Sequence, residues 1–597
     1  MSKGKKRAGR EVDAGKSAPG LAGGRVEGGA RKAVRAARYQ ERAEESERLP
    51  AGLRQGYLGL GGEGETWDEG PRRMTKGGGR VQGRPEDRTG PAGNMPMERQ
   101  SPFVRTRMGK GCLHVVLDRP GKLHALDGSM VGALGEVYRG VQREQDEGHT
   151  RDPGRGRKAE KPVEGPVRGR QVVFLRSSSD ALGPVQGGYL DGGGKRAGER
   201  NGVFCAGGDV REVRDLVLAG EHLRAVQFFR EEFVLDWRTS RVAIHVGVVD
   251  GVCLGGGAGL VMHGTHMLAT ERAAFGMPEC GIGLVPDVGA SWMLPRLAGS
   301  LGMYLALTGD RLLGAEVAAS GVASHFVGSG VLQHVFDRME DVAFQTEGDP
   351  AAIDEAIREY AVPPQDVEVE ADRGLLFYWE AIEATFGVWD EAEGWEAIRE
   401  RVRLRTLPRE SLPPAARGPP PLRGEREFME RALAMLDRQS PTSLKLTHAL
   451  LCRGSRRWVE GLRPQRDFLS GGGKLRAVGA PGRPNRLEDC LRREFNVVRS
   501  LLLAKGGHAD FFEGVTKQLV HKPRGQPQWG PCIDDAGVQA FLQGPTVQDY
   551  RRAGLSQADA EAAAAPLEFP VTVEDTETRN FVRKRALDPK PKFWSSL

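Results

Sequence analysis

Short apolar runs alternate with helical patterns through the middle of the chain, and this alternation restricts the fold more than any other feature. Four apolar runs have the length of β-strands: residues 112–117, 171–175, 242–249 and 266–269. Helical patterns lie at 129–142, 223–238, 256–263, 292–297 and 301–307. Strands that alternate with helices predict an α/β core. After about residue 312 the strand signal stops and helical patterns follow at 350–360, 373–386, 427–437 and 487–503.

Glycine and proline divide the chain into packed and unpacked parts. The 597 residues include 83 Gly and 36 Pro, well above average usage. Residues 1–103 have no lasting period and predict a disordered basic extension. Segments rich in Gly, Pro and Arg predict surface insertions, whose closure entropy grows only slowly with length: 146–170, 181–201, 407–425 and 453–486. We therefore expect an α/β core at 104–330, a helical region at 331–535 and a C-terminal tail at 536–597.

The charge balance limits the classes of partner. Residues 1–100 carry a net charge of +7 and the whole chain +6, so the remaining residues are close to neutral. A neutral body argues against a protein built mainly to bind nucleic acid. Seven scattered cysteines without CxxC spacing favour a reducing compartment and no zinc site. No apolar run approaches the roughly 18 residues of a membrane span, so no membrane partner is expected.

The two ends of the sequence point to different organelles. The first ten residues, MSKGKKRAGR, are basic and free of acidic residues, as in a mitochondrial transit peptide. The last three, Ser595-Ser596-Leu597, differ at one position from the Ser-Lys-Leu peroxisomal signal. Mitochondrial localisation is our prediction and the peroxisome is its alternative.

Two glycine turns follow apolar segments. Gly207 and Gly208 lie within residues 204–209, FCAGGD, where missing side chains let backbone N–H groups approach a ligand. A Gly-Gly-Asp segment is far more often only an ordinary turn. Gly255, Gly256 and Gly257 end an apolar strand and begin an apolar helix. Free N–H groups would converge there on an anion or an oxyanion, although tight helix packing is an equal alternative.

Two acidic residues lie in an apolar stretch at 277–289, MPECGIGLVPDVG. Glu279 and Asp287 are the only acids of this segment. Burial disfavours an ionised carboxylate, so a raised pKa and acid–base or nucleophilic chemistry are expected. Asp287 is also expected to form the N-cap of the helix that follows.

Taken together, these segments resemble the crotonase (enoyl-CoA hydratase/isomerase) superfamily, and within it the 3-hydroxyisobutyryl-CoA hydrolases. The resemblance covers about half the chain, in blocks at 115–120, 124–127, 204–209, 228–233, 242–309, 321–327, 439–445 and 510–515, with Lys522 and Trp529. It implies a spiral of ββα units with a mainly helical C-terminal region. It also implies an acyl-CoA substrate whose thioester carbonyl lies in an oxyanion hole.

The resemblance assigns roles to individual residues. The oxyanion hole would be formed by the N–H groups of Gly208 and Gly256, while Ala125 and Ala206 would contact CoA. Pre-aimed backbone dipoles suit this task because they stabilise charge that develops on the carbonyl oxygen. Glu232 would accept a hydrogen bond from the substrate hydroxyl.

The acidic residues favour a hydrolase over a hydratase. Hydratases have a second glutamate in the helix after the glycine run, and this sequence has Gly259 there. The hydrolase pattern of Glu232, Glu279 and Asp287 is complete. Glu279 would attack the thioester carbon or activate a water, and Asp287 would orient or protonate groups near the leaving thiolate or the substrate hydroxyl. Both routes stay open.

The expected function is cleavage of 3-hydroxyisobutyryl-CoA, or a close 3-hydroxyacyl-CoA, in valine catabolism. The alternatives are an enoyl-CoA hydratase or isomerase and a non-catalytic, hydrolase-like subunit of the mitochondrial ribosome. Neither a metal nor another cofactor is expected, CoA being part of the substrate, and a homo-oligomer is compatible with the sequence. Core or supporting roles are expected for His245, His263 and His266. For Arg296 and Lys445 a salt bridge and a contact with CoA phosphates are alternatives.

Overall fold

The computed structural model describes residues 101–149, 172–178, 202–363, 367, 374–412, 421–455, 486–504, 507–521 and 524–570, without the side chains of 146–149. These residues all belong to one compact unit, Ala92–Leu597. Residues 1–100 of the predicted extension, Lys522 and most of the four predicted insertions lie outside the described residues.

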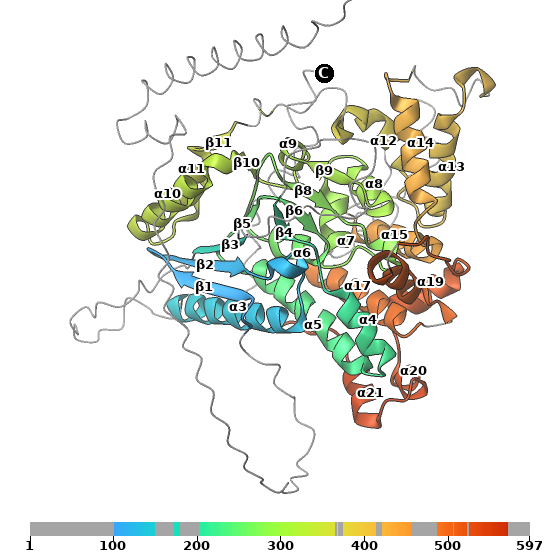
Figure 1. Ribbon diagram of the computed structural model, residues 1–597, viewed down its shortest axis with the longest axis horizontal. Helices are drawn as coiled ribbons and strands as arrows, with labels where there is room; N and C mark the ends of the chain where they lie inside the picture. Colours follow the sequence, from blue (N-terminus) through green and yellow to red (C-terminus); the bar gives the residue numbers. More distant parts are fainter. Residues whose placement is uncertain are drawn as a thin grey trace, which may run out of the picture. The chain divides into compact units, whose positions relative to one another are not determined.

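A seven-stranded sheet forms the centre of the described unit (Figure 1). Its order is β1-β2-β3-β5-β7-β10-β11, and only the pairs at the two edges, β1–β2 and β10–β11, are antiparallel. The strands are Val104–Met108, Cys112–Leu117, Val172–Ser177, Ile244–Val249, His266–Ala269, His325–Val327 and Ala361–Val362. Alternate residues of β3 enter two different clusters of buried apolar side chains, so both faces of this strand are covered.

A second, four-stranded sheet has the order β4-β6-β8-β9. Its strands are Val203–Cys205, Val252–Leu254, Ala274–Gly276 and Arg311–Leu313. The first three run parallel, and β9 is antiparallel to β8. Along the chain a strand of the large sheet is followed by one of the small sheet and then by helix, as in β5, β6 and α6 (Gly256–Met262). The predicted spiral of ββα units is therefore present.

Helices surround the two sheets and make up most of the residues that the structure describes after residue 330. On one side, α10 and α11 cover the large sheet, and on the other α3 packs on α5 and α5 on α17 (Figure 1). The helices not yet given bounds are α3 Gly128–His149, α4 Val210–Leu218, α5 His222–Thr239, α7 Ala290–Met293, α8 Leu301–Thr308, α9 Ala315–Ala319, α10 Leu332–Gln345, α11 Pro350–Arg358, α12 Trp379–Phe386, α13 Gly394–Thr406, α14 Glu425–Leu436, α15 Pro441–Gly454, α17 Leu487–Leu502, α18 Asp510–Val515, α19 Asp535–Gln543, α20 Val547–Arg552 and α21 Gln557–Ala564.

Short helical turns complete the described chain: η1 Pro120–Lys122, η2 Glu279–Ile282, η3 Leu294–Arg296, η4 Ser329–Val331, η6 Leu375–Tyr378, η7 Arg409–Ser411 and the π-helix η11 Thr516–Val520. No helix among the described residues is both long and apolar enough to cross a membrane.

After residue 312 the structure differs from the sequence prediction in two regions. Strand signal does not end at residue 312, because β10 and β11 add two very short strands to the large sheet after it. The segment predicted as a C-terminal tail contains most of α19 and all of α20 and α21. Of these, α19 contacts α17 and α21 contacts α5. The boundaries at residues 330 and 535 themselves stay predictions.

Candidate active site

The small sheet brings three predicted site residues to one edge. Gly208 follows β4, Gly256 follows β6 and Glu279 follows β8, each within a few residues of the strand's end. These strands are parallel neighbours, with β6 between the other two. Since the carboxyl ends of parallel strands meet at one edge of a sheet, the two glycine turns and the glutamate lie together.

The amide groups of Gly208 and Gly256 are close and free. A Cβ atom added to Gly256 would lie 3.2 Å from the Gly208 nitrogen. It would also collide with Oε1 of Glu232, so this position accepts no side chain while that carboxyl is in place. Among the described residues neither N–H donates to a protein acceptor. Two unused donors side by side suit an oxygen that gains negative charge.

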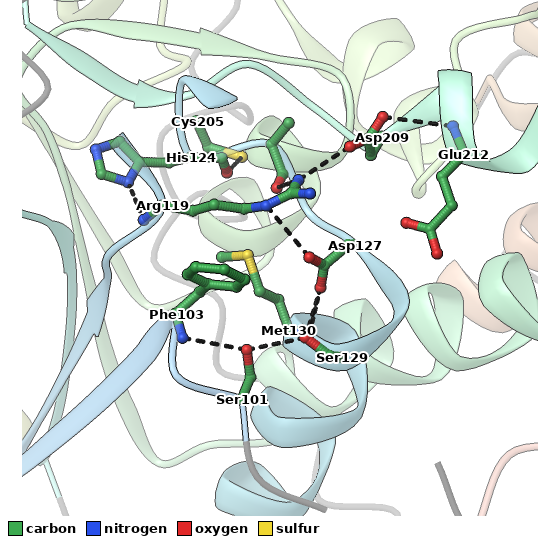
Figure 2. Close-up of polar contacts among 11 residues, drawn as sticks. Ser101, Phe103, Arg119, His124, Asp127, Ser129, Met130, Cys205, Asp209 and Glu212 are labelled. Atoms are coloured by element: carbon green, nitrogen blue, oxygen red, sulfur yellow. Dashed lines mark hydrogen bonds and ion pairs between the residues drawn. The ribbon is translucent and has the colours of Figure 1, made fainter. Parts of the chain in front are cut away.

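An arginine holds the loop that carries Gly208 (Figure 2). Arg119 forms ion pairs with Asp127 at 3.2 Å and with Asp209 at 3.0 Å, and its Nη1 donates to the Ala125 carbonyl at 2.8 Å. The backbone joins the same two loops, since the Asp209 N–H donates to the Leu126 carbonyl at 2.7 Å. The residue after Gly208 is thereby fixed to residues 119–127. Sequence reasoning did not identify Arg119.

The two residues assigned to CoA lie on these loops. Ala125 and Ala206 are both partly exposed, and the Ala206 N–H donates to the Leu123 carbonyl at 3.1 Å. Immediately before Ala125, Leu123 and His124 have φ angles of 55° and 53°. Two consecutive left-handed residues other than glycine are uncommon and occur where surrounding structure enforces them. A contact of either alanine with CoA stays a prediction.

Glu232 and Glu279 are buried beside the glycine turns. Glu232 lies on α5 and is 2% exposed, and Glu279 begins η2 and is 6% exposed. A Cβ atom added to Gly255 would lie 2.5 Å from Oε1 of Glu279. Oε1 of Glu232 and Oε2 of Glu279 have no hydrogen-bond partner among the described residues. Buried polar atoms are normally paired, so these oxygens indicate a place for a ligand or water.

Burial changes the acid–base chemistry of both glutamates. It raises the pKa of Glu232 to about 8. It also raises the pKa of Glu279 to about 8, with a further contribution from the neighbouring Glu232 charge. In the part of the chain that the structure describes, neither carboxyl has an ion-pair partner. Each can therefore exchange a proton near neutral pH.

Asp287 lies 4% exposed in a tight turn ahead of α7. Burial, followed by the charges of Glu232 and Glu279, raises its pKa well above the ordinary range. Val288 has a φ angle of 51°, which is rare for a β-branched residue and costs on the order of 1 to 3 kcal/mol. The turn is thus held in a conformation that its own sequence disfavours.

The predicted N-cap role of Asp287 is wrong. The N-cap of α7 is Gly289, and no cap residue side chain bonds its first turn. The capping carboxylate is instead Glu494 of α17, which accepts the Gly289 N–H at 2.7 Å and the Ser291 N–H at 2.8 Å. Because a distant residue satisfies these donors, the Asp287 carboxyl is free of that task, and its Oδ2 has no partner among the described residues.

A further carboxyl, Asp236, lies next to these acids. It follows Glu232 by one helical turn on α5, is fully buried, and neither of its oxygens has a hydrogen-bond partner among the described residues. A Cβ atom added to Gly259 would lie 2.7 Å from its Oδ1 and 2.8 Å from Cβ of Val288. Sequence reasoning missed Asp236, although its i,i+4 spacing from Glu232 places it on the same helix face.

The histidines and cations have mostly structural contacts. His245 bonds Tyr138 at 2.7 Å, and His266 lies 3.4 Å from Asp354, an acid partner that the sequence did not suggest. Lys445 forms an ion pair with Asp535 at 2.9 Å. Arg296 donates to the carbonyls of Trp292 and Gly454 and stacks on the Trp292 ring. A contact of either cation with CoA stays a prediction.

Several known proteins are similar to this chain in sequence. The enoyl-CoA hydratase/isomerase family matches residues 195–464. A mitochondrial 3-hydroxyisobutyryl-CoA hydrolase of Rattus norvegicus is 31% identical over 58% of this chain and 76% of that protein. The chain belongs to the crotonase superfamily. The enzyme of the same name from Gallus gallus is 32% identical over 58% of this chain and 74% of its own length. The one from Dictyostelium discoideum is 28% identical over 72% and 89%.

Solved structures of the superfamily include a carnitinyl-CoA dehydratase from Mycobacterium thermoresistibile. It is 23% identical, covers 74% of this chain and 96% of that chain, and has a TM-score of 0.49. Membership of the superfamily makes an acyl-CoA thioester the class of substrate, with the free N–H groups and buried acids at the edge of the small sheet as its candidate site.

Proposed function

We propose that this protein hydrolyses 3-hydroxyisobutyryl-CoA, or a close 3-hydroxyacyl-CoA, to the free hydroxy acid and CoA. The observation that carries the proposal is the set of buried acids around the two free amides. Glu232, Glu279 and Asp287 have unpaired oxygens there, while Gly259 leaves a hydratase without its second glutamate. The names of the relatives support the same reaction.

The reaction begins when the thioester carbonyl oxygen accepts the N–H groups of Gly208 and Gly256. Glu279, as the carboxylate, then attacks the carbonyl carbon, or removes a proton from a water that attacks it. In either route the carbonyl π electrons move onto oxygen, and the two donors stabilise that charge. One such donor typically contributes about 3 kcal/mol to lowering the barrier.

Asp287 supplies the proton for the leaving group. Burial and the neighbouring carboxylates raise its pKa well above the ordinary range, which favours the protonated form that can donate. When the oxyanion collapses, the C–S bond breaks and the thiolate takes this proton to leave as a thiol. In the covalent route a water then cleaves the anhydride on Glu279; in the other route the free acid forms directly. In both routes one proton of that water ends on Asp287, by way of Glu279 in the second route, so that Glu279 is again a carboxylate.

Glu232 recognises the acyl group. Its unpaired Oε1 lies beside both glycine amides, within the space that a Cβ at Gly256 would need. A hydroxyl on the third carbon of the acyl chain would reach such an acceptor while the carbonyl occupies the oxyanion hole. This contact would favour hydroxyacyl over plain acyl thioesters, because a buried acceptor left unpaired costs binding energy.

The proposal is tested by thiol release from 3-hydroxyisobutyryl-CoA by the wild type and by Glu279→Gln. We expect rapid release by the wild type and a loss of at least about 100-fold in the variant. Equal rates would refute the proposal. Hydration of crotonyl-CoA that outpaces thioester cleavage would instead favour a hydratase. We further propose a mitochondrial location in valine catabolism, which imaging of the full chain in cells would test.

A further inference from the structure

The turn that carries Asp287 is fixed from outside its own segment. Asp287, Val288 and Gly289 form this turn, and the last two have φ angles of 51° and 86°. Glycine tolerates a positive φ, but valine does not favour one. At the middle of the turn, Nε2–H of His263 donates to the Val288 carbonyl at 2.7 Å.

Glu494 holds the far end of the turn. One carboxylate oxygen accepts the Gly289 N–H, and the other accepts both the N–H and the hydroxyl of Ser291, the latter at 2.5 Å. The residue is fully buried on α17, more than 200 positions after the turn that it binds. Three donors on one carboxylate fix both the position and the direction of the turn.

The geometry points to a role beyond folding. Val288 alone separates Asp287 from Gly289, whose N–H group Glu494 binds. The hydrogen bonds of Glu494 therefore also fix the position of Asp287. We propose that Glu494 is a positioning residue of the hydrolytic site, which keeps the strained turn in the conformation that presents the Asp287 carboxyl to the leaving group. This inference rests on the proposed function.

Charge gives the role a second signature. Among the described residues, carboxyls from three elements interact with Asp287: Glu232 and Asp236 of α5, Glu279 of η2 and Glu494 of α17. His263 binds the carbonyl of the next residue, Val288. The negative charge of Glu494 adds to the raised pKa of Asp287. Its removal should therefore lower that pKa, which the loss of a neutral contact would not do.

The test compares Glu494→Gln with Ser291→Ala and with Glu488→Gln. Glutamine has the shape of glutamate, but its NH2 group would face the N–H group of Gly289 or of Ser291. Two donors cannot bond each other, so the turn should shift. We expect kcat for thiol release to fall about 10- to 100-fold. KM should change less than about threefold, because Asp287 acts on the leaving group. The pH at which activity is lost through deprotonation of Asp287 should also move lower.

Ser291→Ala removes one of the three donors and should lower kcat less, in the same direction. Glu488 lies on the same helix and bonds Trp237 and Arg241, so its glutamine variant serves as the control with wild-type kcat. Wild-type kcat and pH profile in a folded Glu494→Gln would overturn the inference. If that variant fails to fold, wild-type kcat in Ser291→Ala overturns it. No thiol release by the wild type would instead reject the proposed function.

Discussion

Replacement of Glu279 by glutamine should stabilise the protein while it abolishes the activity. In the folded chain burial keeps this carboxyl protonated up to a pKa of about 8. In the unfolded chain it ionises near its ordinary value, about 4.3. Between these values the unfolded state binds fewer protons, so the free energy of unfolding falls as the pH rises. Glutamine does not titrate and escapes this loss.

The size of the effect follows from the two pKa values. Each pH unit inside the window costs the wild type about 1.4 kcal/mol through this residue. The slope is smaller near each of the two pKa values, so from pH 5 to pH 8 the Glu279→Gln variant should gain roughly 3.5 kcal/mol over the wild type. Such a gain is typical of residues kept for activity at the expense of stability.

Urea unfolding of both proteins at several pH values between 5 and 8.5 measures this difference. Glu488→Gln is a control of opposite sign. Although burial opposes its ionisation, its own backbone N–H, Trp237 and Arg241 lower the pKa of Glu488. Its carboxylate therefore stabilises the fold above the unfolded pKa, and this contribution is lost as the pH falls. A difference between Glu279→Gln and wild type that stays constant or shrinks from pH 5 to 8 would refute the reasoning.

Four further outcomes are expected. The value of kcat/KM for thiol release should rise with pH as Glu279 ionises, by roughly tenfold between pH 7 and 9; a flat profile there would contradict an ionised Glu279 as the reacting form. Gly256→Ala should lower kcat at least about 100-fold because its methyl group meets the space beside the oxyanion donors, whereas Gly135→Ala, which has open space on a helix, should keep full activity. Arg119→Leu leaves two acids without their common partner, so its melting temperature should fall and its KM rise; an unchanged KM would show that the loop keeps its shape without the arginine. Asp236→Asn should raise stability at pH 8 more than at pH 5, since burial raises the pKa of this acid as well, and equal gains at both values would speak against that shift.

The local sequence pattern was enough to predict strands that consist mostly of apolar residues. The strands at 112–117 and 266–269 follow from continuous apolar runs, and both have these bounds in the structure. The small sheet was missed because β4, β6 and β8 have three residues each, too few for a recognisable period. The sequence placed Gly208, Gly256 and Glu279 in separate motifs, and their meeting depends on the pairing of just these strands.

Sequence reasoning missed contacts between residues that lie far apart in the chain. Asp287 was expected to cap α7, since local capping is the common rule. The cap comes from Glu494, and no pattern near residue 289 could announce a partner that far along the chain. In the sequence nothing distinguishes Arg119 from other loop arginines, because one of its two partners, Asp209, lies 90 positions away. Only Asp236 left a readable signal, its position one turn after Glu232.

A side chain at position 259 would occupy the same space as Asp236 and Val288. A glutamate at 259, as hydratases have, would begin with a Cβ atom only 2.7 Å from the Asp236 carboxyl and 2.8 Å from Val288. Exchange of that glycine alone would bring two acids and a rigid branched side chain into one volume. A glutamate at 259 therefore requires at least one accompanying change, at 236 or in the strained turn.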